Sequence, residues 1–230
     1  MTENEKATET PAPTPVAESS AAMDLLLPFR VLVTPVKTFA QLAQRSTAKG
    51  LITLAALILV TLVAFQYATA TRIYLTVTSG QPSVSFIATE SFTNWFTNIL
   101  ASTSLFILMY WLIIATALAL VSRFFGGKEA KLRNSLVIFA YLLSVFVVLY
   151  AVRAITYLAL PQITFDIGSW PPMDQATIDA AVGRISQNWS SLPVYQFGSY
   201  FTFVALVWLV LLGTIAVKTL RDISWTKASL

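Results

Sequence analysis

Four stretches of this sequence are long and apolar enough to cross a membrane, and no other feature limits the possible folds as strongly. They cover residues 51–70, 99–121, 135–160 and 200–217, they contain no Asp or Glu, and Arg153 is their one charged residue. About 20 apolar residues at ~1.5 Å per residue cross the ~30 Å hydrocarbon layer. We therefore predict an all-α integral membrane helical bundle with four transmembrane helices plus amphipathic interfacial helices. The third span has a second possible end, near Ala151.

The composition divides the chain into four regions. Residues 1–22 are rich in Thr, Glu, Pro and Ala, hold no aromatic residue, and are expected to form a disordered cytoplasmic tail. Residues 23–50 form an interfacial amphipathic segment, residues 51–220 the transmembrane domain and residues 221–230 a second cytoplasmic tail. With 56% hydrophobic and 11% charged residues, the chain has too little polar surface for a soluble globular domain.

An amphipathic helix is predicted to begin at Pro35, after Thr34 as its N-cap. Helical spacing puts an apolar stripe on one face and polar residues on the other, the stripe being Val36, Phe39, Ala40 and Ala43 and the polar face Lys37, Gln41, Gln44 and Arg45. A basic polar face opposite an apolar stripe is typical of a helix lying at the membrane surface. The stripe is equally suited to packing on the bundle.

The distribution of basic residues predicts the orientation. Of the 15 Lys and Arg residues, 12 lie before the first span, between the second and third, or after the fourth. The other three, Arg72, Arg153 and Arg184, fall toward the opposite side. By the positive-inside rule, both termini and the central loop are cytoplasmic, and we expect a plasma membrane or prokaryotic inner membrane location.

The two outer loops have different patterns. In residues 71–98, β-branched and aromatic residues alternate around a turn composition at residues 79–82, which fits a short hairpin or a frayed extension of the first span. In residues 161–197, helical spacing of Ile178, Ala181, Val182 and Ile185 predicts an amphipathic helix on the outer surface. Trp170 and Trp189 flank it and are expected at interface depth.

The residues that carry most chemistry are missing. The chain has no Cys and no His, and the spans hold neither a pair of aspartates nor a lysine. Thiol or imidazole catalysis and Cys/His zinc sites are thereby excluded, and we expect no enzyme, cofactor, metal or nucleic-acid partner. Arg153 lies near the outer end of its span, so we interpret it as an interfacial anchor that snorkels toward headgroups; the alternative is a transport residue.

The loop between the second and third spans, RFFGGKEAKLRNS, is the most distinctive cytoplasmic stretch. Gly126 and Gly127 are expected to form a tight turn that ends the second helix, because the spacing of a phosphate-binding loop is absent. Lys128, Lys131 and Arg133 would then face an anionic leaflet. Together with Pro35 and Phe39, these residues form the predicted surface for anionic headgroups or a partner.

Three features together resemble one known family. They are PVKTFAQLAQ at residues 35–44, FGGKEAKLRNSLVIFAY at residues 125–141, and the end of the last span with VKTLRDIS at residues 217–224. This combination resembles the Yip-one domain family, named for proteins that interact with Ypt/Rab GTPases. Pro35, Phe39, Gly126, Gly127 and Tyr141 are the positions that we align with it.

The resemblance implies a multi-pass helical membrane protein without catalytic residues and with a cytoplasmic N-terminus. Eukaryotic members carry an acidic-Leu-Tyr-Gly-Pro motif near the second span, where this chain has ESFTNW at residues 90–95. Members commonly have a proline in the third helix, which is absent here, and often five spans. The resemblance thus indicates a prokaryotic-style member.

Two functions remain open from the sequence. The first is a non-enzymatic membrane protein that acts through helix packing and a basic cytoplasmic face, in membrane organisation or in recruiting a membrane-protein partner or a second copy. The second is a small permease or channel for a neutral or lipid-like solute. A polar cavity between the spans would favour transport, whereas a filled bundle with a groove open to lipid would favour the first function.

Overall fold

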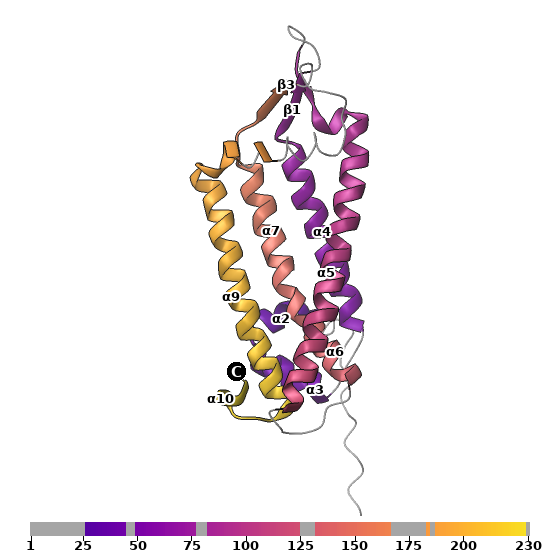
Figure 1. Ribbon diagram of the computed structural model, residues 1–230, viewed down its shortest axis with the longest axis vertical. Helices are drawn as coiled ribbons and strands as arrows, with labels where there is room; N and C mark the ends of the chain where they lie inside the picture. The colour runs from indigo at the N-terminus through magenta and orange to yellow at the C-terminus, as the bar shows by residue number, and fades with distance from the viewer. Residues whose placement is uncertain are drawn as a thin grey trace, which may run out of the picture.

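Four long helices lie side by side in this protein (Figure 1). The computed structural model describes residues 26–44, 49–76, 82–124, 132–166, 183–184 and 187–228. Within them, four helical segments are long and apolar enough to cross a membrane: Gly50–Ala70, Phe92–Leu120, Asn134–Leu158 and Pro193–Arg221. They belong to α4 (Lys49–Ala70), α5 (Glu90–Phe124), α6 with α7 (Leu132–Ala140 and Ser144–Leu158) and α9 (Pro193–Arg221). The predicted all-α membrane bundle is confirmed.

The third span forms the centre of the bundle. In the most apolar 18-residue stretch of the third span, 61% is buried inside the protein. The corresponding stretch of the second span, which lies in α5, is only 17% buried. α7 packs against α4 on one side and α9 on the other. Side chains of α5 such as Leu105, Phe106 and Ile113 are at least 60% exposed, so they face lipid once the bundle is in a membrane.

A short 3-10 segment, η2 (Tyr141–Leu143), interrupts the third span. The Ser144 hydroxyl donates a hydrogen bond of 2.6 Å to the Tyr141 carbonyl, three residues earlier. Such a side-chain bond competes with the regular helical pattern and bends helices. The interruption lies in the run where the proline common in the family is absent. The helix continues to Leu158, close to the later of the two possible ends of the span.

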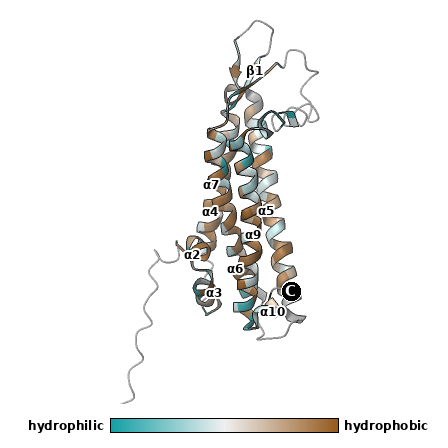
Figure 2. Ribbon diagram, turned by 90° about the vertical axis from the view of Figure 1, so that its left-hand side faces the viewer, coloured by the Kyte–Doolittle hydropathy of each residue, from teal (hydrophilic) through white to brown (hydrophobic). Residues whose placement is uncertain are grey.

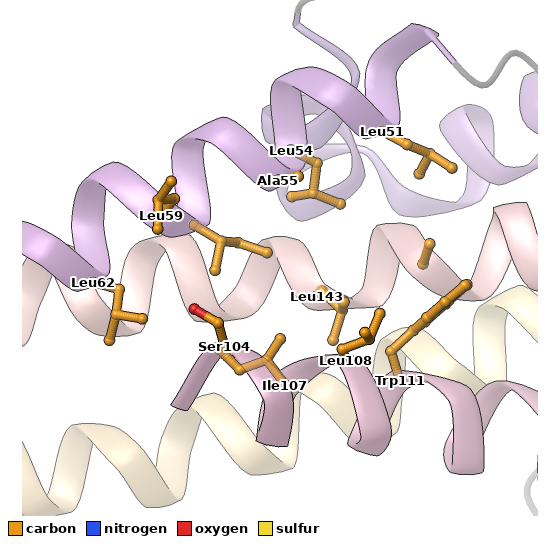
Figure 3. Close-up of a pocket in the computed structure, with 12 residues that line it drawn as sticks. Leu51, Leu54, Ala55, Leu59, Leu62, Ser104, Ile107, Leu108, Trp111 and Leu143 are labelled. Atoms are coloured by element: carbon orange, nitrogen blue, oxygen red, sulfur yellow. The ribbon is translucent and has the colours of Figure 1, made fainter. Parts of the chain in front are cut away.

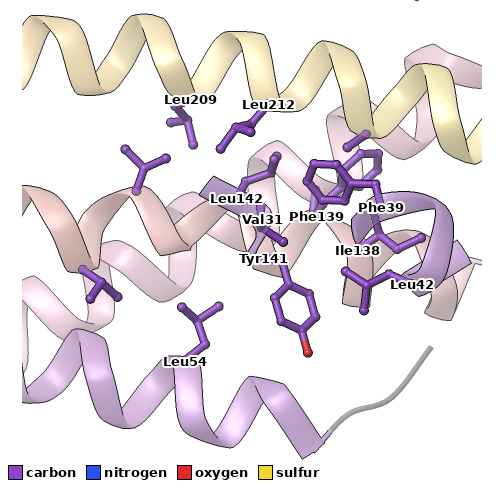
Figure 4. Close-up of a cluster of buried hydrophobic side chains, with 14 of the residues drawn as sticks. Val31, Phe39, Leu42, Leu54, Ile138, Phe139, Tyr141, Leu142, Leu209 and Leu212 are labelled. Atoms are coloured by element: carbon purple, nitrogen blue, oxygen red, sulfur yellow. The ribbon is translucent and has the colours of Figure 1, made fainter. Parts of the chain in front are cut away.

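Two short helices pack against the end of the bundle at which α10 (Trp225–Ala228) also lies, here called the α3 end (Figures 1 and 2). They are α2 (Leu27–Val33) and α3 (Pro35–Gln44). Hydrophobic colouring dominates the middle of the long helices, which fits their place in hydrocarbon (Figure 2). One apolar cluster joins α2 and α3 to the third span and α9 (Figure 4), through Val31, Phe39, Leu42, Ile138, Phe139, Leu142, Leu209 and Leu212.

The opposite end, here called the sheet end, carries a three-stranded sheet in the order β2-β1-β3 (Figure 1). β1 (Ile73–Thr76) pairs antiparallel with β2 (Val84–Ser85), which confirms the hairpin alternative for this loop. The short helix η1 (Phe86–Ala88) connects β2 to α5. β3 (Ile163–Asp166) pairs in parallel with β1, with Ile73 opposite Ile163, and the sequence did not predict this strand.

The sheet covers a second, smaller apolar cluster made of Ile73, Leu75, Leu160, Phe165 and Trp189. The indole Nε1 of Trp189 donates to the Pro161 carbonyl at 3.2 Å, and the side chain is 1% exposed. We had expected Trp189 at interface depth, and at whatever depth it lies the protein covers its side chain. The predicted amphipathic helix at Ile178, Ala181, Val182 and Ile185, and Trp170, lie outside the described residues.

Candidate functional site

An apolar groove of about 380 Å³ lies between α4 and α5, with the third span at its base (Figure 3). It is open on one side. α4 and α5 supply most of its walls, and the third span contributes Ala140 at the end of α6 and Leu143 at the end of η2. The lining residues are Leu51, Leu54, Ala55, Ile58, Leu59, Leu62, Ser104, Ile107, Leu108, Trp111, Ala140 and Leu143.

The groove has a buried floor and an exposed rim. Leu54, Leu62 and Ile107 are at most 6% exposed, whereas Leu59 and Leu108 on the rim are 47% and 53% exposed. Toward the α3 end, Ala115 and Ala119 of α5 are each 1% exposed, as a pair of small residues in a helix contact should be. α5 therefore packs closely against the bundle at Ala115 and Ala119, whereas the part of α5 that lines the groove is exposed on one side.

Trp111 is the one lining residue of the groove whose side chain carries an N–H group. The ring lies between α4 and α5, at the end of the groove where Leu51 also lies (Figure 3). Its Nε1 is buried and has no hydrogen-bond acceptor among the described residues. A buried indole N–H usually has a partner. The protein covers this Nε1, so Trp111 contributes apolar surface to the groove.

Arg153 makes its contacts inside the bundle, in the second half of α7. Its Nη2 donates to the Thr202 hydroxyl of α9 at 2.9 Å, and the guanidinium lies 5.7 Å from the centre of the Phe65 ring of α4. The Thr202 hydroxyl in turn donates to the Gly198 carbonyl. Our interpretation of Arg153 as an interfacial anchor stays a prediction. The structure adds contacts from Arg153 of α7 to α9 and α4, so this residue connects three spans.

Arg221 makes a contact between two spans that the sequence did not predict. It was counted only as one of the basic residues that set orientation, yet it is 4% exposed at the end of α9. Its Nη2 donates to the Ala119 carbonyl of α5 at 3.2 Å. Next to it, Asp222 has a left-handed backbone (φ 55°), which turns the chain so that Lys218 lies 4.8 Å from the Trp225 ring centre. A charge in the last turn of a long apolar helix was the available signal.

The structure describes three of the predicted membrane-surface residues, Pro35, Phe39 and Arg133. Pro35 begins α3, and Phe39 is fully buried against the bundle together with Thr38 and Leu42. Val36 of the predicted stripe is 52% exposed, so the buried side of α3 is only partly the predicted one. The polar side, with Lys37 and Gln41, is exposed. α3 also contacts α6, whose first turn contains Arg133. Gly126, Gly127, Lys128 and Lys131 lie outside the described residues.

Among the described residues, no group of three or more His, Cys, Asp or Glu side chains is placed to hold a metal ion. The fold and the groove define an integral membrane helical bundle with a lipid-facing apolar groove and an amphipathic helix docked at one end. The model of the Yip1 domain family matches residues 29–230, so the chain belongs to this family, as its motifs predicted. No curated protein and no solved structure matches it.

Proposed function

We propose that this Yip1 domain protein is non-enzymatic and organises the membrane, or recruits a partner, through the surface at its α3 end. In this proposal the protein resides in a plasma membrane or prokaryotic inner membrane, with both termini in the cytoplasm. Its surface combines the exposed side of α3 with residues 126–133. Its targets are anionic headgroups, a membrane-protein partner or a second copy of the chain.

The docking of α3 is the observation that carries this proposal. Thr38, Phe39 and Leu42 are at most 2% exposed, so α3 is fixed to the bundle by its apolar side. Its other side presents Lys37, Gln41 and Gln44 to the outside. A basic face held rigidly at the surface of a bilayer attracts anionic lipid, at about 1 kcal/mol for each Lys or Arg near the surface.

The groove also supports this function over the permease alternative. A solute pathway needs polar or ionisable groups between the spans to replace hydration. The groove between α4 and α5 is lined by apolar side chains apart from Ser104, and it opens to the side of the bundle. Arg153, the one charged residue of the four predicted spans, bonds to Thr202 of a neighbouring span.

Charge reversal at the α3 end tests the proposal. The triple variant Lys128→Glu, Lys131→Glu and Arg133→Glu should co-purify with less anionic lipid or less of a partner protein than the wild type, and the difference should grow at low salt. Arg184→Glu, an exposed position near the sheet end, is the matched control and should change nothing. If the wild type, the triple variant and Arg184→Glu co-purify with equal amounts of lipid and protein, the basic residues serve only to set the topology, and the proposal is wrong.

A further inference from the structure

We propose that Lys218 and Trp225 bind the headgroup of an anionic phospholipid in the leaflet nearest the α3 end. In this arrangement the Lys218 ammonium group pairs with the lipid phosphate, and the Trp225 ring lies at the border between headgroups and hydrocarbon. Residues 222–228 then form an anchor at the membrane surface and not a free tail. The inference goes beyond the proposed function, because the surface proposed there consists of α3 and residues 126–133.

Lys218 lies on the lipid-facing side of α9. Positions seven residues apart lie on almost the same face of a helix, about 20° from each other, and Val204, Leu211 and Lys218 are spaced in this way. Val204 and Leu211 are 58% and 47% exposed on the outside of the bundle. Lys218 therefore continues the outer face of α9, where lipid surrounds the protein in a membrane.

The depth of Lys218 corresponds to the headgroup layer. The apolar run of the fourth span, residues 200–217, ends directly before it. α9 has 29 residues, about 43 Å at ~1.5 Å per residue, which exceeds the ~30 Å hydrocarbon layer and matches the ~40–45 Å that includes the headgroups. A lysine at the end of such a helix extends its ammonium group toward the membrane surface.

The turn after α9 brings Trp225 back to the same level. Asp222 has a left-handed backbone, and Ile223, which is 8% exposed, packs into the apolar cluster that also holds α3. α10 lies beside the end of α9 (Figure 1), and the Lys218 Nζ lies 4.8 Å from the centre of the Trp225 ring. The ring is therefore level with Lys218, about 4.5 Å before the end of α9 at Arg221.

The pair has the chemistry that recognises an anionic headgroup at the edge of a bilayer. Trp225 stays 53% exposed, and Trp is enriched at this level because its ring accepts apolar and polar neighbours together. The Lys218 ammonium group lies over the ring and carries three N–H donors, so it can also bind a phosphate. The charge selects an anionic headgroup, and the ring fixes the site at the border of the hydrocarbon.

The place of Trp225 can be measured in the full-length protein, labelled with 5-fluorotryptophan, in nanodiscs of phosphatidylcholine and phosphatidylglycerol. Trp225→Phe identifies its fluorine resonance, and Trp189→Phe identifies the matched control, whose side chain is 1% exposed. A lipid with a nitroxide near the top of its acyl chain broadens signals at the membrane border, whereas a water-soluble gadolinium chelate broadens signals in water.

We expect the nitroxide to broaden the Trp225 signal more than the Trp189 signal, and more than the chelate does. A Trp225 signal that the chelate broadens most would place the ring in water, free for a protein partner. A signal that neither agent broadens would mean that a second copy of the chain covers the ring. Either result would overturn the inference.

The role of Lys218 is tested by replacing phosphatidylcholine with phosphatidylglycerol in steps. In the wild type, the Trp225 resonance should shift as the anionic lipid pairs with Lys218. In Lys218→Gln the midpoint of this shift should lie at about fivefold more phosphatidylglycerol, as the loss of one Lys near an anionic surface predicts. Lys37→Gln, on the exposed side of α3, is the matched control and should keep the wild-type midpoint. Equal midpoints in all three proteins would refute the pairing.

This proposal and the proposed function fail separately. The triple charge-reversal variant should keep the shift of the Trp225 resonance, because its substitutions lie outside α9 and α10. Lys218→Gln should in turn co-purify with the lipid or partner that the exposed side of α3 and residues 126–133 bind.

Discussion

The hydrogen bond from Arg153 to Thr202 should contribute about 1 kcal/mol to the stability of the bundle. The bond is 2.9 Å long and involves a charged donor, both of which favour a strong interaction. The Thr202 proton is already donated to the Gly198 carbonyl, so the hydroxyl oxygen is free to accept. Hydrogen bonds between membrane helices have an average value of ~0.6 kcal/mol and reach ~1.7 kcal/mol.

A double-mutant cycle isolates this interaction. Thr202→Val keeps the shape and removes the acceptor, and Arg153→Leu removes the donor together with the contact to the Phe65 ring, worth a further ~0.5 to 1 kcal/mol. We therefore expect Arg153→Leu to cost ~1.5 to 2 kcal/mol, with a coupling energy of ~1 kcal/mol to Thr202→Val. Arg153→Lys should be tolerated better, because an ammonium group keeps the charge and one donor.

Reversible unfolding in mixed detergent micelles gives the free energies. Thr214→Val is the matched control: Thr214 also lies on α9 and donates to a carbonyl of its own helix, that of Val210. It should show no coupling to Arg153→Leu. A coupling energy below ~0.3 kcal/mol for Thr202 would show that Arg153 acts as an independent interfacial anchor. A solute flux through reconstituted protein that disappears in Arg153→Lys would instead support the permease hypothesis.

Three further predictions follow from the same structure. An impermeant thiol reagent added to intact cells should label Ser83→Cys and spare Ser224→Cys, both exposed positions in a chain without native cysteine; the reverse pattern would contradict the proposed orientation. Phe39→Asp should release α3, costing at least ~3 kcal/mol, and raise its amide exchange in nanodiscs, whereas Gln41→Asp should not; equal protection would mean that other contacts hold α3. Arg221→Met should lower the free energy of unfolding by ~1.5 to 3 kcal/mol, because the buried charged bond to α5 is lost, and an unchanged value would refute that contribution.

The sequence determined the properties that depend on one segment at a time. A span is recognised from its own length and apolar composition, so the four transmembrane helices followed from the chain alone. The polar side of α3 followed from helical spacing, and the β1–β2 hairpin from a turn composition between two short runs. The Yip1 family was also recognisable, because its motifs are local.

Contacts between distant segments could not be read from the sequence. β3 becomes a strand because the ends of the first and third spans meet, which places Ile163 opposite Ile73. The break at Tyr141–Leu143 contains neither Gly nor Pro, and the Ser144 hydroxyl that bonds to the Tyr141 carbonyl gives no signal in the sequence, because serine is common in unbroken helices. Arg153 and Arg221 resembled surface charges, and only the packing of α9 gave them partners on other spans.

The groove is the clearest case of a feature that only the tertiary structure decided. Its walls are leucines, isoleucines and alanines that satisfy the requirement for crossing hydrocarbon wherever they point, so hydropathy does not distinguish a groove from a filled contact. Helix periodicity assigns residues to a face, but the distance between α4 and α5 depends on the side chains of four spans together. In lipid, no hydrophobic force closes such a gap, because a lipid chain covers apolar surface as well as a leucine does.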